Sequence, residues 1–432
     1  MLNKWKQTIS KFVCFVLTCQ LFILTAWAKP DWPSDTGIMA EAGIVMDMDS
    51  GAILYGQNIH LTYPPASITK ILTALIVLEN CNLDDTVTFS TTAVNQVEAD
   101  SGNKISVVAG DELSVEDCLY SMLLVSCNQA ANALAEHTAG SISAFVDMMN
   151  EKLAQLGCQE SHFENPSGLN GDNQYVSAYD MALIAQAAYD NEALVEISSA
   201  TTHKIAPTTQ NPDGFTIRGE HRLCVTEDPS SPYYYPEAIA GKTGYLIKAG
   251  NTLVTYAVKD NRRLVSVILK GQPRQYFVDG KALLEFGFRS FQDYTVADYE
   301  SRYVTGNETI NLDKGSFQAS DLMIDPDSVI TLPNSASFED ADITLGALPE
   351  ISPDNAVALL TYSYNDRTIG TAYLLAKDGI IIDGNDSAAE AATTAFDTAN
   401  AEASLATASN AEKPQRPHKH ISVAGVLITI LI

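Results

Sequence analysis

Three short motifs place side chains that could together perform nucleophilic catalysis. The first is Ser67-Ile68-Thr69-Lys70, in which a hydroxyl and an amine lie three residues apart. At the start of a helix this spacing puts both groups on one face. A serine needs a base to become a nucleophile, and a lysine whose pKa is lowered by burial or by a neighbouring cation can serve. Taken alone, the motif also fits a capped helix with a solvated lysine.

The other two motifs are Ser126-Cys127-Asn128 and Lys242-Thr243-Gly244. The former falls at a predicted break between two helices, where a hydroxyl and an amide can project into one cleft. The latter is expected at the start of an edge strand. There the lysine supplies positive charge, the threonine a hydroxyl, and the glycine leaves room for a peptide backbone to lie against the strand. Separately, a polar helix junction and an ordinary turn would also explain these two motifs.

The elements that would position these motifs follow from the spacing of apolar residues. Apolar positions recur at helical intervals from Ile68 to Ile76, so a helix is expected to begin near Ser67. Ser114 and Asp117 form a predicted capping box for a helix that ends near residue 125. A further helix is predicted over residues 144–156. Strands are predicted over 43–48 and 52–55, around the turn at 49–51, and over 252–258 and 264–269, which form a hairpin around Asp260-Asn261.

The three motifs stand in the order typical of class A β-lactamases and penicillin-binding proteins, roughly 60 and then 115 residues apart. Over about residues 40–288 the chain resembles the D-alanyl-D-alanine carboxypeptidase family, peptidase family S11. Further segments carry this resemblance, namely Ile44-Val45-Met46-Asp47, Pro65-Ala66-Ser67-Ile68-Thr69-Lys70, Leu113-Ser114-Val115-Glu116-Asp117 and Asn165-Pro166-Ser167-Gly168-Leu169.

The resemblance implies a fold and an activity. The fold is an α/β (α+β) catalytic domain of the serine β-lactamase and D,D-peptidase type, followed by a small all-β domain. The activity is that of a serine-type carboxypeptidase, which removes the terminal D-alanine from peptidoglycan stem peptides through an acyl-enzyme. The implied partners are these stem peptides and β-lactams, which act as covalent inhibitors. No cofactor or metal is expected.

The resemblance also implies a role for each motif residue. Ser67 would be the acylated nucleophile and Lys70 its base, while Ser126 would relay a proton to the leaving amine. Asn128 would hold Lys70 and the substrate amide. Lys242 and Thr243 would receive the substrate's terminal carboxylate, with Arg274 as a further candidate, and Gly244 would leave room for the substrate backbone. The backbone N–H groups of Ser67 and Tyr245 would form the oxyanion hole.

The chain departs from the family pattern at two places. Tyr245 follows the third motif where many relatives have histidine, and its expected contribution is its backbone N–H. A histidine that often follows the Asn-Pro-x-Gly-Leu segment is absent near Gln174 and Tyr175. The second departure puts loop contacts in doubt but leaves the nucleophile unaffected.

Three other functions compete with this one. A β-lactamase shares the motifs but needs a loop glutamate for fast deacylation, and no Glu-x-x-Leu-Asn pattern occurs between residues 165 and 194. A D,D-endopeptidase, which cuts peptidoglycan cross-links, would use the same residues and remains the main alternative. A silent wall-binding protein would have little reason to retain both lysines and both serines.

Charge and cysteine content restrict the function further. The formal charge of −27 disfavours nucleic-acid binding, which requires a basic surface, so an anionic substrate must be attracted locally. The cysteines beyond residue 28 are odd in number and scattered, which is not a disulfide framework. No C-x-x-C motif or histidine cluster offers a zinc site.

Composition divides the chain into five segments. Lysines followed by an apolar run and Ala26-Trp27-Ala28 predict a secretory signal over residues 1–28. The catalytic domain is expected over 29–290 and the β-rich domain over 291–378, with strands over 329–332, 342–345, 356–364 and 368–375. Residues 379–420 read as an acidic linker with a basic end, and 421–432 as an apolar tail. A twelve-residue helix reaches about 18 Å, short of the roughly 30 Å hydrocarbon core. We therefore expect an exported enzyme whose tail attaches it to the outer face of the cell membrane.

Overall fold

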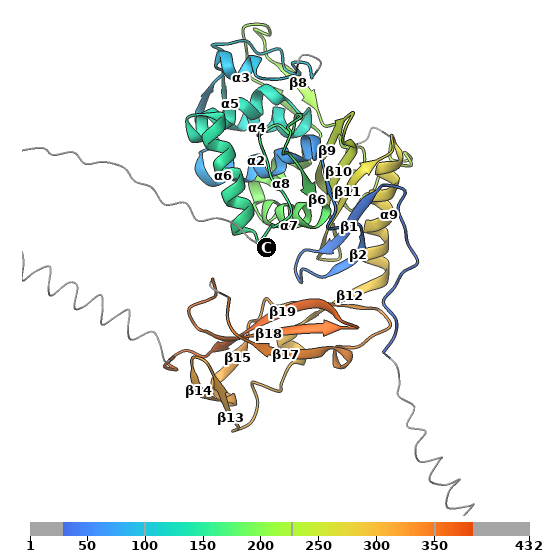
Figure 1. Cartoon of the computed structure of the whole chain (residues 1–432), viewed down its shortest axis with the longest axis vertical. Helices are drawn as coiled ribbons and strands as arrows, with labels where there is room; N and C mark the ends of the chain where they lie inside the picture. The colour runs from blue at the N-terminus through green and yellow to red at the C-terminus, as the bar shows by residue number, and fades with distance from the viewer. Residues whose placement is uncertain (1–28, 99–100, 226–227, 350, 383–432) are drawn as a thin grey trace, which may run out of the picture.

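The computed structural model describes residues 29–98, 101–225, 228–349 and 351–382. Helices and a five-stranded sheet form the larger part of the molecule, and a sheet-rich region lies beneath them (Figure 1). The predicted signal, the apolar tail and almost all of the acidic linker fall outside the described residues. Within the described residues, no helix is both long and apolar enough to cross a membrane.

The five-stranded sheet is antiparallel, and the predicted strands and hairpin are present in it. Its order is β2-β1-β11-β10-β9, which leaves β9 at one edge. The bounds are β1 Ala42–Asp47, β2 Ile53–Gln57, β9 Ala238–Leu246, β10 Gly250–Lys259 and β11 Arg262–Gly271. The hairpin turn at Asp260 and Asn261 has positive φ at both residues, as a two-residue turn between twisted strands requires.

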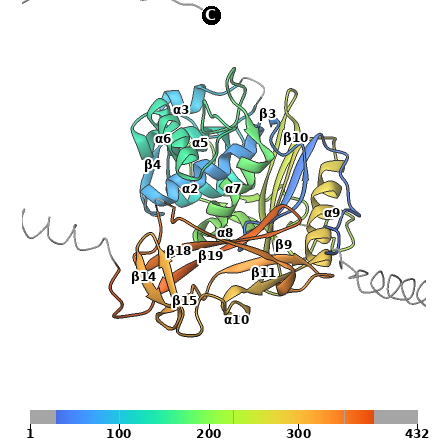
Figure 2. The ribbon, with the colours of Figure 1, turned by 60° about the horizontal axis from the view of Figure 1, so that its bottom comes forward.

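Both faces of this sheet are covered. Ile44 and Met46 on β1 join the core formed with the helical part, whereas Val45 joins a second core under α9 (Gln275–Ser290). This alternation follows from the period of two in a strand, and it explains why every residue of β1 is buried. Figure 2 shows α9 on the outer side of the sheet, with the helical part on the other side.

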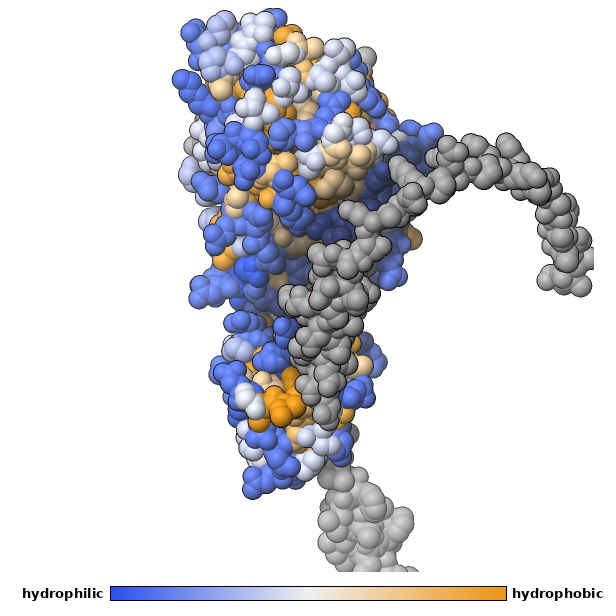
Figure 3. All heavy atoms as spheres, turned by 90° about the vertical axis from the view of Figure 1, so that its left-hand side faces the viewer, coloured by the Kyte–Doolittle hydropathy of each residue, from blue (hydrophilic) through white to orange (hydrophobic). Residues whose placement is uncertain are grey.

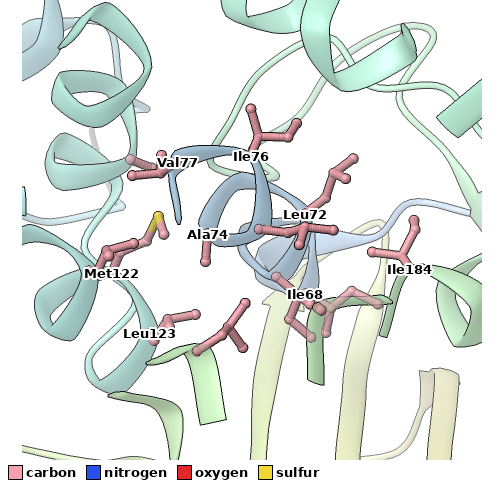
Figure 4. Close-up of a cluster of buried hydrophobic side chains, with 14 of the residues drawn as sticks. Ile68, Leu72, Ala74, Ile76, Val77, Met122, Leu123 and Ile184 are labelled. Carbon is pink, nitrogen blue, oxygen red and sulfur yellow. The ribbon is translucent and has the colours of Figure 1, made fainter. Parts of the chain in front are cut away.

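The helical part is built around α2, whose first eight residues are buried. Figure 4 shows Leu72, Ala74 and Val77 of α2 packed among side chains from α4 and α7. The helices are η1 Ala66–Thr69, α2 Lys70–Asn80, α3 Thr91–Asn95, α4 Val115–Leu124, α5 Asn128–Ala139, α6 Ile142–Gln155, α7 Ala178–Tyr189 and α8 Glu192–Ser199. Three short strand pairs complete it: β3 Thr62–Tyr63 with β6 Val176–Ser177, β4 Thr86–Thr88 with β5 Glu112–Ser114, and β7 Thr202–Ile205 with β8 Phe215–Arg218.

The predicted capping box at α4 forms only in part. The Ser114 side chain accepts a hydrogen bond from the backbone N–H of Asp117, which caps the helix. The Asp117 carboxylate does not return the bond. It lies 2.6 Å from Nε2 of His203 and accepts from the backbone N–H of Ala206. The Asp117 carboxylate is buried against β7 and bonds to groups on and beside that strand. A local sequence motif cannot predict such tertiary partners.

The sheet-rich region forms one six-stranded sheet of order β12-β16-β19-β18-β17, with β15 also paired to β19. The four strands predicted here correspond to β16, β17, β18 and β19, and the rest were not predicted. The bounds are β12 Phe291–Thr295, α10 Val296–Tyr299, β13 Thr309–Leu312, β14 Gly315–Gln318, η2 Ala319–Asp321, β15 Leu322–Ile324, β16 Val329–Pro333, η3 Phe338–Asp340, β17 Asp342–Gly346, β18 Ala356–Tyr364 and β19 Arg367–Ala376. The face drawn in Figure 3 is largely hydrophilic, with apolar side chains in small groups.

Candidate active site

Ser67 lies in the short helix η1, directly before α2, and lines a cavity of about 1390 Å³. Among the other residues that line the cavity are Ser126, Asn128, Thr243 and Gly244. Residues from all three motifs therefore meet in one cavity, although up to 177 positions separate them along the chain.

Lys70, the first residue of α2, is completely buried beside Ser67. Its Nζ lies 3.0 Å from Oγ of Ser67 and 2.8 Å from Oδ1 of Asn128, and it also donates to the carbonyl oxygen of Ser167. Burial lowers the pKa of Lys70 well below its ordinary value, and the charge of Lys242 lowers it further. Both effects favour the neutral form of Lys70, which is the form that can accept a proton.

The partners of Lys70 orient its lone pair. A neutral amine has two N–H groups and one lone pair. The Asn128 side-chain oxygen and the Ser167 carbonyl oxygen carry no hydrogen, so each takes one N–H. The lone pair then faces Ser67, the one partner of the three whose oxygen carries a proton. This arrangement can remove the hydroxyl proton from Ser67.

The second motif forms the turn between α4 and α5. Ser126 adopts a left-handed backbone conformation, with φ of +61°, and lines the cavity. Asn128 begins α5 and points its amide at Lys70. Cys127 between them is buried in the core, where burial raises the pKa of its thiol to about 11. Cys127, the middle residue of this motif, therefore contributes to core packing.

The third motif lies on the sheet edge, as predicted, but not at the start of its strand. β9 begins at Ala238, four residues before Lys242, because Ala238 and Ala240 already pair with β10 and pack in the core. Lys242 is 2% exposed, and its Nζ donates to the carbonyl oxygen of Thr243 at 2.9 Å. Burial lowers the pKa of Lys242 to about 8, opposed by the charge of Glu220, so this lysine is still largely protonated at neutral pH.

Gly244 is required by the contact between β9 and η1. A Cβ atom at this position would lie 2.3 Å from Oγ1 of Thr252 and 2.9 Å from the backbone nitrogen of Ser67. The backbone of β9 therefore passes directly beside Ser67. Tyr245 follows with its side chain 62% exposed at the cavity.

Arg274 also lines the cavity, from the loop that precedes α9, and has a positive φ of +68°. A second arginine on the wall, Arg222, lies over the ring of Tyr233, and Lys104 forms an ion pair with Glu220 at 3.4 Å. The sequence interpretation named Arg274 but missed Arg222 and Lys104, because isolated charges in loops carry no spacing signal. Within the described residues, no group of three or more His, Cys, Asp or Glu side chains could hold a metal ion.

A known protein family matches the region that contains these residues. Residues 29–272 match the family profile described as D-alanyl-D-alanine carboxypeptidase, peptidase family S11. The chain belongs to this family. A D-alanyl-D-alanine carboxypeptidase from Haemophilus influenzae is 30% identical over 78% of this chain and 84% of its own length. One from Mycobacterium tuberculosis is 35% identical over 60% of this chain and 84% of its own length.

Solved structures agree with this membership. Penicillin-binding protein 5 from Haemophilus influenzae aligns with a TM-score of 0.62 at 25% identity, covering 80% of this chain and 98% of that protein. A Streptomyces DD-transpeptidase aligns with a TM-score of 0.54 at 26% identity, over 59% of this chain and 99% of that protein. The predicted mixed α/β fold of the D,D-peptidase type, with a sheet-rich region after it, is confirmed.

Proposed function

We propose that this D-alanyl-D-alanine carboxypeptidase acts through Ser67 as nucleophile and Lys70 as its base. The observation that carries the proposal is the confinement of Lys70 between Ser67, Asn128 and the Ser167 carbonyl. A buried neutral amine with a lone pair directed at a hydroxyl is a general base for that hydroxyl.

The substrate is a peptidoglycan stem peptide that lies extended along the free edge of β9. Its terminal carboxylate is received by Thr243 on the cavity wall and by the charge of the buried Lys242 beside it, with Arg274 on the cavity wall as a further cation. A buried positive charge at this point offsets the repulsion that an acidic chain would exert on an anionic substrate.

Acylation and hydrolysis then follow in two steps. Lys70 takes the proton from Ser67, whose Oγ bonds to the carbonyl carbon of the penultimate D-alanine. The backbone N–H groups of Ser67 and Tyr245 stabilise the oxyanion, at about 3 kcal/mol per donor. The peptide C–N bond breaks, Ser126 relays the proton held by Lys70 to the leaving nitrogen, which returns Lys70 to its neutral form, and D-alanine departs. Water cleaves the remaining ester. Penicillin would acylate Ser67 by the same first step.

Replacement of the nucleophile tests this mechanism. Ser67→Ala should abolish both D-alanine release and labelling by a fluorescent penicillin, with an unchanged circular dichroism spectrum. Ser143→Ala, at an exposed position of α6, is the matched control and should retain both. A folded Ser67→Ala protein that is still labelled would refute the assignment.

We further propose that the enzyme works at the outer face of the cell membrane. Residues 29–290 contain every proposed site residue, so the remaining segments are free to locate the enzyme. Support comes from the secretory pattern of residues 1–28, and from Lys413, Arg416 and Lys419 before the apolar residues 421–432. Burying these aliphatic side chains at about 25 cal/mol per Å² would give several kcal/mol of membrane affinity.

Deletion of residues 421–432 tests the attachment. The truncated enzyme should move from the membrane pellet to the soluble fraction, with no change in its rate on a soluble stem-peptide substrate. Pellet association that survives the deletion would show that another surface makes the attachment.

A further inference from the structure

The loop that supplies the Ser167 carbonyl is fastened to α2 at two successive residues. The carbonyl oxygen of Pro166 accepts from Oγ1 of Thr73 at 2.7 Å, and the carbonyl oxygen of Ser167 accepts from Nζ of Lys70. Thr73 and Lys70 are three residues apart and so share one face of the helix. The position of the Ser167 carbonyl thus depends on the conformation of residues 165–169.

That conformation is organised by one side chain, Asn165. Its Oδ1 accepts from the backbone N–H of Ser167 at 3.3 Å, of Gly168 at 2.8 Å and of Leu169 at 3.1 Å, and from Oγ of Ser167 at 3.0 Å. Its Nδ2 donates to the carbonyl oxygen of Leu169 at 3.1 Å. With three successive backbone N–H groups turned toward Oδ1, the loop cannot change without breaking several bonds at once.

The loop is also pressed against the nucleophile helix. Gly168 has φ of +81°, and a Cβ atom there would lie 1.9 Å from the carbonyl oxygen of Ala66, the residue before Ser67. From the far side, Oε1 of Gln174 accepts from the backbone N–H of Glu164 at 3.0 Å and of Asn165 at 3.1 Å. Gln174, near which the family's histidine is absent, thus holds the start of this loop by two hydrogen bonds of its own.

We propose that Asn165 is a positioning residue for the reaction, because it fixes the Ser167 carbonyl against Lys70 so that the lone pair of the amine faces Ser67. This inference rests on the proposed function. Asn165 is not among the residues that line the cavity, so it acts through the loop. Without it, the carbonyl can move away and Lys70 can turn its lone pair elsewhere, and a misplacement of about 1 Å can cost about 100-fold in rate.

The test uses three variants of the full chain and measures penicillin acylation as a function of drug concentration and pH. Asn165→Ala removes the acceptor. Asn165→Asp keeps an oxygen that can accept all four bonds. Asn150→Ala is the matched control, since Asn150 braces the start of the same segment through the backbone of Phe163 but does not contact residues 165–169. Thermal unfolding verifies that each variant is folded.

We expect Asn165→Ala to lower the limiting acylation rate about 10- to 100-fold without changing the apparent dissociation constant of penicillin. Asn165→Asp should recover a rate within a few-fold of the wild type. The apparent pKa of the acylation rate should shift in opposite directions in the two variants. It falls in Asn165→Ala, because the protonated amine loses an acceptor, and rises in Asn165→Asp, because a negative charge is added. Lys242 and Cys127, the ionisable groups that act on Lys70, are unchanged in both variants.

Two results would overturn the proposal. One is an Asn165→Ala protein that is acylated at the wild-type rate per folded molecule. The other is an equal loss in Asn165→Ala and Asn150→Ala, which would indicate general loosening of the segment. If Asn165→Ala does not fold, Asn165→Ser, with its shorter acceptor, takes its place in the comparison. Failure of the wild type itself to react would instead refute the assignment of Ser67.

Discussion

Two lysines in this site have the same side chain, but their surroundings act differently on their pKa values. Lys70 and Lys242 are both buried, and each lacks a carboxylate among the hydrogen-bond partners described for it. The pKa of Lys70 is lowered further by the charge of Lys242, whereas Glu220 raises the pKa of Lys242 and leaves it near 8. When two titratable groups in a site have pKa values that are shifted apart, the group with the lower pKa can act as base and the other can remain a cation.

The pKa of Lys242 predicts a pH limit on substrate binding. As the pH rises through about 8, Lys242 loses its charge, and KM for a substrate with a free terminal carboxylate should rise. Lys242→Gln should have a KM at least about tenfold higher at neutral pH, since a charge-assisted contact contributes about 1.5–3 kcal/mol. The measurement is a series of KM values between pH 6 and 10.

Lys248→Gln, an exposed lysine on the same cavity wall, is the control for this series and should retain the rise above pH 8. The docking role would be wrong if the wild-type enzyme cut a carboxamide-ended peptide as efficiently as the free acid.

At the residue scale, the sequence could predict side chains but not backbone partners. Ser67, Lys70, Ser126 and Lys242 could be selected because reactive residue types stand in a known order. The carbonyl oxygen of Ser167 could not, because every residue has one and its use depends on the loop conformation. The available signal was Gly168, since a glycine in a recurrent segment often marks a positive φ and a close backbone approach.

At the element scale, catalysis depends on how closely β9 approaches η1. Gly244→Ala should push these elements apart, because its Cβ would lie 2.9 Å from the Ser67 nitrogen, and should lower the acylation rate about 100-fold. We expect a simultaneous loss of about 1–3 kcal/mol in the free energy of unfolding from overpacking. Stopped-flow labelling with penicillin and urea titration measure the two effects.

A glycine in a strand away from the site provides the comparison. Gly346 in β17 has only the carbonyl oxygen of Leu359 near its prospective Cβ, at 3.7 Å. Gly346→Ala should therefore leave acylation unchanged. Equal acylation rates in Gly244→Ala and the wild type would mean that β9 can move away from η1 without slowing acylation.

Most elements of the catalytic part could be predicted because local patterns determine them. The Asp49-Ser50-Gly51 turn between two short apolar runs predicted β1 and β2, and the Asp260–Asn261 turn predicted the β10–β11 hairpin. The start of β9 was not predictable, since it depends on small residues that pair with β10, and neither was the left-handed conformation of Ser126, which a non-glycine residue adopts only under tertiary constraint.

At the scale of the whole molecule, the five-stranded sheet and the sheet-rich region are joined by a closed polar network. Arg262 on β11 forms ion pairs with Asp47 on β1 at 3.1 Å and with Asp293 on β12 at 2.9 Å. A chain of hydroxyls closes the ring on the other side. Ser50 contacts Asp47 at 3.2 Å and Thr331 at 2.7 Å, and Thr331 donates to Asp293 at 2.9 Å.

If both carboxylates of this ring are ionised, its hydroxyl groups supply one hydrogen too few for its oxygen–oxygen contacts. The path from Asp47 through Ser50 and Thr331 to Asp293 has three oxygen–oxygen contacts, but its two hydroxyls supply only two hydrogens. A proton on one carboxyl group completes the path. In agreement, burial and the charge of Asp293 raise the pKa of Asp47 to about 7, against the opposing effects of Arg262 and of the Ser50 backbone N–H, which donates to Oδ1 of Asp47 at 3.1 Å.

The retained proton predicts how stability depends on pH. The pKa of Asp47 is about 7 in the folded chain and 3.8 ordinarily, so between these values the folded state binds a proton that the unfolded state has released. The stabilisation is complete below pH 3.8 and is lost as the pH rises through 7. Asp47→Asn has no carboxyl group to titrate at this position, so its free energy of unfolding should fall less than that of the wild type between pH 5 and 7.5, by about 1 kcal/mol or more. Urea titrations at the two pH values measure this difference, with Asp313→Asn as an exposed control. Parallel curves for the wild type and Asp47→Asn would show that both carboxylates are ionised and that the hydroxyl path is not a continuous hydrogen-bonded link between the two sheets.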